Sequence, residues 1–234
     1  MSISLGSLKR FVGLMLKKMG PVGQRIHDRL SPTERKFRQS MIDSVEAAHV
    51  KLKAARSSKA QLEIGSGPTK REGWITLDMC RGADVYCDLR DKIPFEASCF
   101  DRVYCSHVLE HFVYHDLKKL LKEVYRVLRP DGEFLIAVPD ASIYVDAYMG
   151  KRDAAELIQY KPAIASTKSM DLLNYMFYMD GHHKFMFDAE NLAFHCEAAG
   201  FVNCASRPFD PSLDMADRDY ESLYMSCRKQ ERNT

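Results

Sequence analysis

The sequence lacks three features that would place it in common classes of protein. Its seven cysteines are scattered and odd in number and include no C-x-x-C pair, so we predict reduced thiols, no redox motif and no metal site. No run of about 18 apolar residues occurs, so no segment is predicted to span a membrane. No internal repeat is present. The 234 residues, 46% of them hydrophobic, therefore predict one α/β domain of a cytoplasmic protein.

Acidic residues are scarce at the start of the chain. Residues 1–60 hold 13 Lys and Arg against 4 Asp and Glu, whereas the whole chain has a net charge of only +2. Within residues 1–20, apolar side chains recur at helical spacing between lysines and arginines. This pattern predicts a basic amphipathic helix that packs on its own domain or on the mate in a homodimer. Peripheral contact with the inner face of a membrane is the alternative.

Two connections are too short to hold the helices that usually join parallel strands. Only six residues separate Gly67 from Trp74, and four separate Asp78 from Ala83, whereas a strand-helix-strand crossover needs about a dozen. One face of the sheet would then be bare near these strands. We expect an amphipathic helix over residues 33–59 to cover it, with Phe37, Met41 and Val45 touching the sheet.

The remaining chain alternates between strands and helices. This order predicts an open, mostly parallel α/β sheet with an antiparallel edge strand and N-terminal helices. Residues 1–59 are predicted to form a basic helical extension, and 60–234 the main domain. Within it, the aromatic-rich residues 140–187 are interpreted as a lid over an acceptor site or as a subunit interface. The expected strands are 61–64, 74–78, 83–88, 100–105, 133–139, 201–206 and 223–228, and the expected helices are 116–129 and 188–199.

The stretch from Gln61 to Asp78 holds the pattern around which the other motifs of the chain are arranged. It reads as a buried strand, a glycine turn at Gly65 and Gly67, and a second strand that ends on an acid. Glycines at such a turn let the backbone bend sharply and lie against a ligand. By itself this stretch is compatible with any nucleotide-like ligand or with none.

Six motifs, in this order along the chain, add to the indication of a ligand site. They are LEIGSG, WITLD, CDLRDKIPF, FDRVYCSHVLEHF, LKEVYRVLRPDGEFLIAVPD and FDAENLAFHCEAAGF, between Gln61 and Ser206. Together they resemble the class I S-adenosylmethionine-dependent methyltransferases, type 11, whose sheet is Rossmann-like. The compact LxxGSGPTKxxGWxxLD segment is similar to a subgroup associated with bacterial surface-polysaccharide biosynthesis. The chain departs from the commonest pattern at Thr69, where the third motif glycine is expected.

The resemblance implies S-adenosyl-L-methionine as the cofactor and assigns residues to it. The backbone at Gly65, Ser66 and Gly67 would meet its methionine part, with Glu63 holding the loop or the amino group. Asp78 and the adjoining Met79 would contact the ribose. The other implied contacts are Asp88 and Leu89 at the adenine, and Ser106 and His107 near the transferable methyl group.

A hydroxyl acceptor needs a base or a metal to remove its proton. The leading candidates for a base are His107, which ends the cofactor strand, and His182, where the insertion returns. The weaker candidates are His183, His111 and Asp140, with Glu110 as a further orienting acid. For each histidine, a purely structural role is the alternative.

The resemblance therefore implies a methyltransferase (EC 2.1.1 class) that O-methylates a sugar, glycan or small molecule by in-line transfer. An RNA methyltransferase is the alternative that the basic N-terminal residues favour. Against it, Val138-Pro139-Asp140 stands where an N/D-P-P-Y/F motif would be expected. We therefore expect no nucleic-acid partner. A non-catalytic cofactor-binding subunit that regulates a glycosyltransferase is a further alternative. A polyamine synthase is disfavoured because no pair of acids follows the fourth strand.

Overall fold

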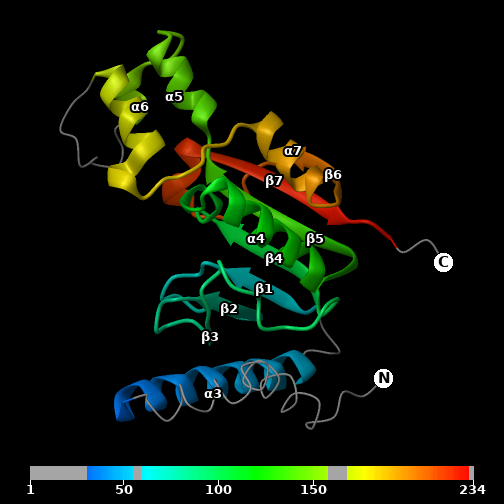
Figure 1. Cartoon of the computed structure of the whole chain (residues 1–234). Helices are drawn as coiled ribbons and strands as arrows, with labels where there is room; N and C mark the ends of the chain where they lie inside the picture. Colours follow the sequence, from blue (N-terminus) through cyan, green and yellow to red (C-terminus); the bar gives the residue numbers. More distant parts are fainter. Residues whose placement is uncertain (1–30, 55–58, 158–167, 232–234) are drawn as a thin grey trace.

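A computed structural model describes residues 31–54, 59–157 and 168–231. Figure 1 shows the arrangement of their helices around one central sheet. The predicted basic helix of residues 1–20, with its membrane or dimer contact, lies outside the described residues. Among the helices described, none is long and apolar enough to cross a membrane.

The sheet has seven strands in the order β3-β2-β1-β4-β5-β7-β6. Strands β1 to β5 run parallel, and β7 pairs antiparallel with both β5 and β6. The predicted mostly parallel sheet with antiparallel pairing at one edge is confirmed. The strands are β1 Gln61–Ile64, β2 Trp74–Asp78, β3 Val85–Tyr86, β4 Phe100–Ser106, β5 Leu128–Pro139, β6 Phe201–Ser206 and β7 Ser222–Lys229.

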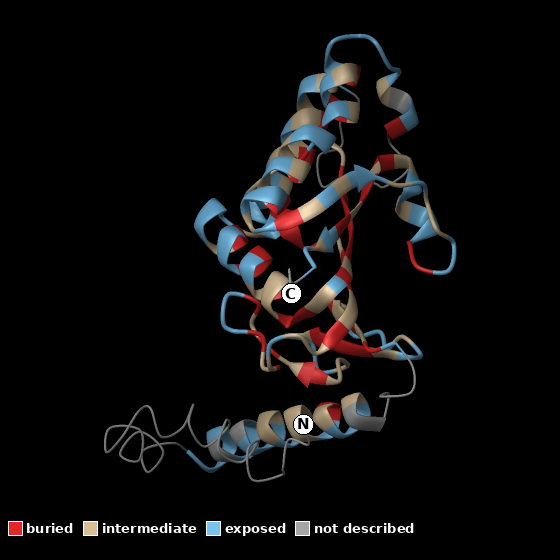
Figure 2. Ribbon diagram, turned by 90° about the vertical axis from the view of Figure 1, so that its right-hand side faces the viewer, coloured by how far each residue is buried: buried red, intermediate tan, exposed pale blue. Residues whose placement is uncertain are grey.

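Two helices cover one face of this sheet, α4 (Tyr114–Val127) and α7 (Ala189–Ala198). The apolar stripe predicted for residues 116–129 is buried against the sheet from Leu117 to Val127. The helix ends two residues earlier than expected, because Pro130 cannot continue it and Leu128 already pairs with Phe100 of β4. Helix α7 begins at the capping box of Asp188 and Asn191. Buried residues concentrate along the sheet and these helices (Figure 2).

Helix α3 (Pro32–Ala54) lies along the β3 edge of the sheet (Figure 1). The ring of Phe37 meets Tyr86 of β3 edge-on at 5.2 Å, and Val45 packs against the core. The predicted sheet contact is therefore confirmed for these two residues, whereas Met41 is half-buried on the same helix. No helix forms in the links 65–73 and 79–84, as their lengths required.

The opposite face of the sheet is covered by single side chains in place of the missing crossover helices. Tyr104, Leu135 and Leu213 form a small apolar cluster with Trp74. Above it, Arg207 donates two hydrogen bonds, of 2.6 and 2.7 Å, to the fully buried carboxylate of Asp214. The Tyr104 hydroxyl donates a third to the same carboxylate, at 3.1 Å.

The predicted insertion of residues 140–187 forms a helical unit with its own small core. Helices α5 (Ala141–Tyr148) and α6 (Ser169–Tyr178) pack together away from the sheet (Figure 1). Their shared buried side chains are Tyr144, Ala147, Leu157, Leu172 and Met176. Short 3-10 helices complete the chain as η2 Leu109–His111, η3 Ala154–Leu157, η4 Met179–Gly181 and η5 Ala216–Glu221.

Candidate functional site

The glycine turn after β1 has a backbone that favours glycine at two positions. Gly65 has φ +69° and Gly67 has φ +62°, in the left-handed region. A Cβ atom on Gly65 would lie 2.2 Å from a methyl carbon of Val108, so no side chain fits there. A Cβ atom on Gly67 would meet nothing within 4 Å, so this glycine borders open space.

Asp78 ties the end of β2 to this turn. Its Oδ2 accepts a hydrogen bond of 2.9 Å from the amide of Gly67, and its Oδ1 accepts one of 2.7 Å from the amide of Cys80. The carboxylate is half-buried and each oxygen keeps a free lone pair, so it can still accept hydroxyl groups. Ser66 is half-buried beside it, and Met79 is exposed.

The carboxylate of Glu63 is held by the link that follows the turn. Arg71 donates to both of its oxygens, at 3.0 and 3.4 Å. The same guanidinium donates to the backbone oxygens of Ser212 and Leu213. Glu63 therefore anchors the β1–β2 link, which is one of the two roles expected for it.

The predicted adenine contacts lie just after β3. Asp88 is half-buried and pairs with Arg90 at 2.5 Å, and this hydrogen bond holds the pKa of the carboxyl group below its ordinary value. Leu89 is buried in the main core. The carboxylate predicted to accept a hydrogen bond from adenine is thus present at this strand end, where it already pairs with an arginine.

The end of β4 carries Ser106 and His107. The buried Ser106 hydroxyl has no hydrogen-bond partner among the described residues. His107 has φ +52°, and its Nε2 lies 2.9 Å from Ser222 Oγ. Because Ser222 donates its only hydroxyl proton to the Arg218 carbonyl at 2.6 Å, His107 Nε2 is the donor in that contact. Its Nδ1 is buried, makes no hydrogen bond and lies 3.6 Å from Glu110 Oε1.

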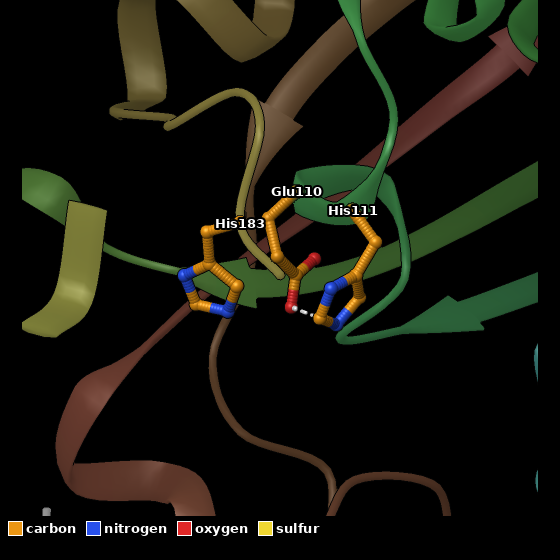
Figure 3. A group of neighbouring side chains, drawn as sticks. All are labelled: Glu110, His111 and His183. Atoms are coloured by element: carbon orange, nitrogen blue, oxygen red, sulfur yellow. Dashed lines mark ion pairs between the residues drawn. The ribbon is translucent and has the colours of Figure 1, made fainter. Parts of the chain in front are cut away.

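Three side chains converge on the turn after β4 (Figure 3). Glu110 is 1% exposed, and its Oε2 has no partner among the described residues. His111 Nε2 lies 3.9 Å from Glu110 Oε1, and the side chain of His111 is partly exposed. His183 is buried beside them, and burial lowers its pKa. Their ligand atoms lie within 4.8 Å of one another.

The other two predicted catalytic residues do not place their side chains in this cluster. His182 is exposed and contributes its backbone carbonyl, which bonds His111 Nδ1 at 3.1 Å. Asp140 caps helix α5 by accepting from the amide and hydroxyl of Ser142. Both positions have structural tasks in this fold, whereas the weaker candidates His111 and His183 meet at Glu110.

Several residues around this cluster had no recognisable pattern in the sequence. Ser222 begins β7, Glu221 accepts a 2.8 Å hydrogen bond from Tyr144 of the insertion, and Arg218 donates to the same carboxylate at 2.8 Å. These residues come from the last third of the chain and reach the β4 turn only through the fold. Of the acids at this cluster, only Glu110 was expected from the sequence, as an orienting acid.

These features fit S-adenosylmethionine. Open space at Gly67 adjoins the Asp78 carboxylate, and an unpartnered buried hydroxyl stands at Ser106, all at carboxyl ends of parallel strands, where such sheets bind ligands. A separate cavity of about 630 Å³ lies instead at the amino ends of β1 and β2, between Lys51, Lys70 and Trp74. That cavity is not part of the cofactor site.

Parts of the chain are similar to known proteins. The chain is 31% identical over 100 residues to the uncharacterized protein YBR225W of Saccharomyces cerevisiae, covering 41% of this chain and 11% of that protein. It is 33% identical over 86 residues to sterol 4-C-methyltransferase strm-1 of Caenorhabditis elegans, covering 37% of this chain and 24% of that protein. The chain therefore spans less than a quarter of the length of these curated relatives. The crystal structure of YcgJ from Bacillus subtilis has a TM-score of 0.45 and 16% identity, covering 81% of this chain and 99% of that one.

A family model locates the matched region. Residues 44–136 match the type 11 methyltransferase model, described as a methyltransferase domain. This region holds β1 to β4, most of β5, the glycine turn, Asp78 and the β4 turn. Residues 44–136 are thus similar to a methyltransferase domain, and this similarity covers less than half of the chain.

Proposed function

We propose that this chain methylates a hydroxyl group of a sugar, glycan or small-molecule acceptor. The observation that carries this proposal is the group of three imidazoles around the buried carboxylate of Glu110, next to the cofactor strand end. A hydroxyl must lose its proton as it becomes a nucleophile, whereas a neutral amine attacks through a lone pair that it already has. A cluster of proton acceptors at this position therefore favours an oxygen acceptor.

When bound, S-adenosylmethionine supplies a methyl group on a sulfonium sulfur, so that the new C–O bond forms as the C–S bond breaks and its electron pair leaves with the sulfur. The chain's own residues orient it. Gly67 permits close approach of the backbone, Gly65 lets the turn pack on Val108, and Asp78 accepts hydroxyl groups through its free lone pairs. Ser106 offers an uncommitted hydroxyl beside them.

His111 is the residue that we assign to the proton. Its Nδ1 contacts the carbonyl of His182 at 3.1 Å, which fixes the proton on Nδ1 and leaves Nε2 with a lone pair. Of the three imidazoles it has the most exposed side chain, at 40%, so an acceptor can reach it. Glu110, at 3.9 Å, stabilises the imidazolium that forms. His107 acts through Glu110 as a positioning residue, because its own nitrogens are buried.

The acceptor class is inferred from the sequence. The compact segment from Leu62 to Asp78 is similar to methyltransferases of surface-polysaccharide biosynthesis, which favours a glycan. A lipid-linked glycan at the inner face of a membrane would agree with peripheral attachment through the basic residues 1–20.

The test is methyl transfer from radiolabelled cofactor to lipid-linked glycans, RNA and small metabolites in separate fractions. We expect alkali-stable label, as in a methyl ether, in a glycan or small-molecule fraction. Glu110→Gln should lower the rate about 100-fold or more while calorimetry shows unchanged cofactor affinity. His115→Ala, an exposed histidine of α4 outside the cluster, is the matched control. Label confined to RNA, or full activity in Glu110→Gln, would refute the proposal.

A further inference from the structure

The cluster at the β4 turn has the composition of a metal centre. Glu110, His111 and His183 supply one carboxylate and two imidazoles, with ligand atoms within 4.8 Å of one another (Figure 3). The two segments are 72 positions apart in sequence, but Lys184 and Phe185 both donate their amides to the carbonyl of Glu110, at 2.7 and 3.1 Å. Backbone hydrogen bonds therefore hold the three side chains together before any ion arrives.

Both imidazoles present the same nitrogen to the carboxylate. His111 Nδ1 contacts the carbonyl of His182, and His183 Nδ1 contacts the carbonyl of Met176. A carbonyl can only accept, so each Nδ1 carries the proton and each Nε2 keeps its lone pair. Metal-binding histidines are oriented in this way, with the second nitrogen donating to a carbonyl or a carboxylate.

Glu110 lacks the partners that a buried carboxylate requires. The residue is 1% exposed, its Oε2 makes no hydrogen bond with any described residue, and its Oε1 is 3.6 and 3.9 Å from the nearest imidazole nitrogens. The nearby Arg218 guanidinium is hydrogen-bonded to Glu221. An uncompensated buried charge costs several kcal/mol. A cation between Glu110, His111 and His183 would remove that cost.

We propose that Glu110, His111 and His183 bind a divalent first-row transition metal such as Zn²⁺. Two imidazoles and one carboxylate suit these ions, whereas Mg²⁺ and Ca²⁺ prefer sites built of oxygen alone. Metal–ligand bonds of about 2.0–2.2 Å bring tetrahedral ligand atoms to roughly 3.3–3.6 Å apart, so the cluster contracts on binding. The solvent-exposed side of His111 leaves room for a further ligand.

The role of this ion rests on the proposed function. An acceptor hydroxyl at the open position would lose its proton more readily, because a bound divalent cation lowers the pKa of a coordinated oxygen. The proton passes to solvent, and the oxygen lone pair becomes the nucleophile. In this form of the reaction His111 is a ligand and the cation replaces it as the activating group.

Metal binding is measured first, without methyl transfer. The full chain is treated with a chelator, dialysed and titrated with ZnCl₂ by calorimetry, and Co²⁺ is added to record its visible absorption. We expect one equivalent of Zn²⁺, a Co²⁺ spectrum of low coordination number, and a rise in the melting temperature with Zn²⁺. Glu110→Gln and His111→Ala should each weaken binding about 100-fold or more, because even outer partners of a metal site are worth about 10–100-fold. His115→Ala should bind as the wild type does.

The outcomes separate this inference from the proposed function. Absence of Zn²⁺ heat and of a Co²⁺ spectrum in the wild type, or binding that survives in both cluster variants, refutes the metal site. Full methyl transfer by the chelator-treated protein refutes the ion's role and leaves the proposed function standing. One equivalent of Zn²⁺ lost in both variants, without methyl transfer to any acceptor, supports the metal site and refutes the proposed function.

Discussion

The two glycines of the turn after β1 should respond very differently to the same substitution. Both have positive φ, which costs an alanine about 1–2 kcal/mol. At Gly65 the new methyl group would also lie 2.2 Å from a methyl carbon of Val108, whereas at Gly67 it would meet nothing within 4 Å. Overpacking of this kind costs about 1–3 kcal/mol. We therefore expect Gly65→Ala to lower the free energy of unfolding by about 2–5 kcal/mol and Gly67→Ala by about 1–2 kcal/mol.

The assay is urea denaturation of the wild type, both single variants, Val108→Ala, and the double variant Gly65→Ala with Val108→Ala. Removing the Val108 methyl groups should relieve the clash, so the double variant should be about 1–3 kcal/mol more stable than the sum of the single effects predicts. Cofactor binding should show the reverse order. Gly67→Ala places a methyl group in the open space beside Asp78. It should lower the affinity for the cofactor more than its effect on stability explains.

Equal destabilisation by the two glycine variants, or strict additivity in the double variant, would refute the packing of Val108 on the turn. Unchanged cofactor affinity in Gly67→Ala would show that the open space at this glycine is not where the ligand lies.

Three further predictions concern single carboxylates. Asp78→Ala should abolish cofactor binding in calorimetry, and retained affinity would mean that the cofactor does not use this strand end. Asp214→Asn should lower the free energy of unfolding by about 3–5 kcal/mol, because it leaves a buried arginine without its partner, whereas exposed Asp146→Asn should change it by less than about 0.5 kcal/mol in the same denaturation assay. Burial favours the neutral form of Asp84, but hydrogen bonds led by that from Lys51 hold its pKa below the ordinary value of 3.8. Its contribution to stability is therefore present above about pH 4 and lost as the pH falls through the lowered pKa. Asp84→Asn should flatten that part of the stability profile, and an unaltered profile would show that this carboxyl does not titrate against folding.

The architecture was largely readable from periodicity and spacing. The alternation of strands and helices predicted the mostly parallel sheet, and the links after Gly67 and Asp78 were correctly predicted to be too short for crossover helices. The prediction that a helix covers the sheet near β3 was also correct, since Phe37 of α3 contacts β3 and Val45 of α3 packs against the core. What spacing could not reveal is the cover of the other face. Leu213 and the ion pair of Arg207 with Asp214 come from a connection without periodicity, so no local pattern announces them.

The candidate site likewise has a part that the sequence predicted and a part that it did not. The glycine turn and Asp78 are adjacent in sequence, and their hydrogen bond follows from a short link between paired strands. The positions of the histidines in the sequence could not show which of their rings meet, because a side chain's direction depends on distant contacts. His182 was preferred for its position, but its ring is exposed while the neighbouring His183 ring turns inward to the carbonyl of Met176.

The sequence by itself determined the order of elements and the cofactor end of the sheet, because helices, strands and turns are encoded by residues that are neighbours in the chain. Only the tertiary structure decided which acid and which imidazoles meet. Glu110 and His183 are far apart in sequence, and their convergence depends on backbone hydrogen bonds between the β4 turn and the returning insertion. Local patterns specify each segment, whereas a site made of several segments exists only once the sheet has aligned them.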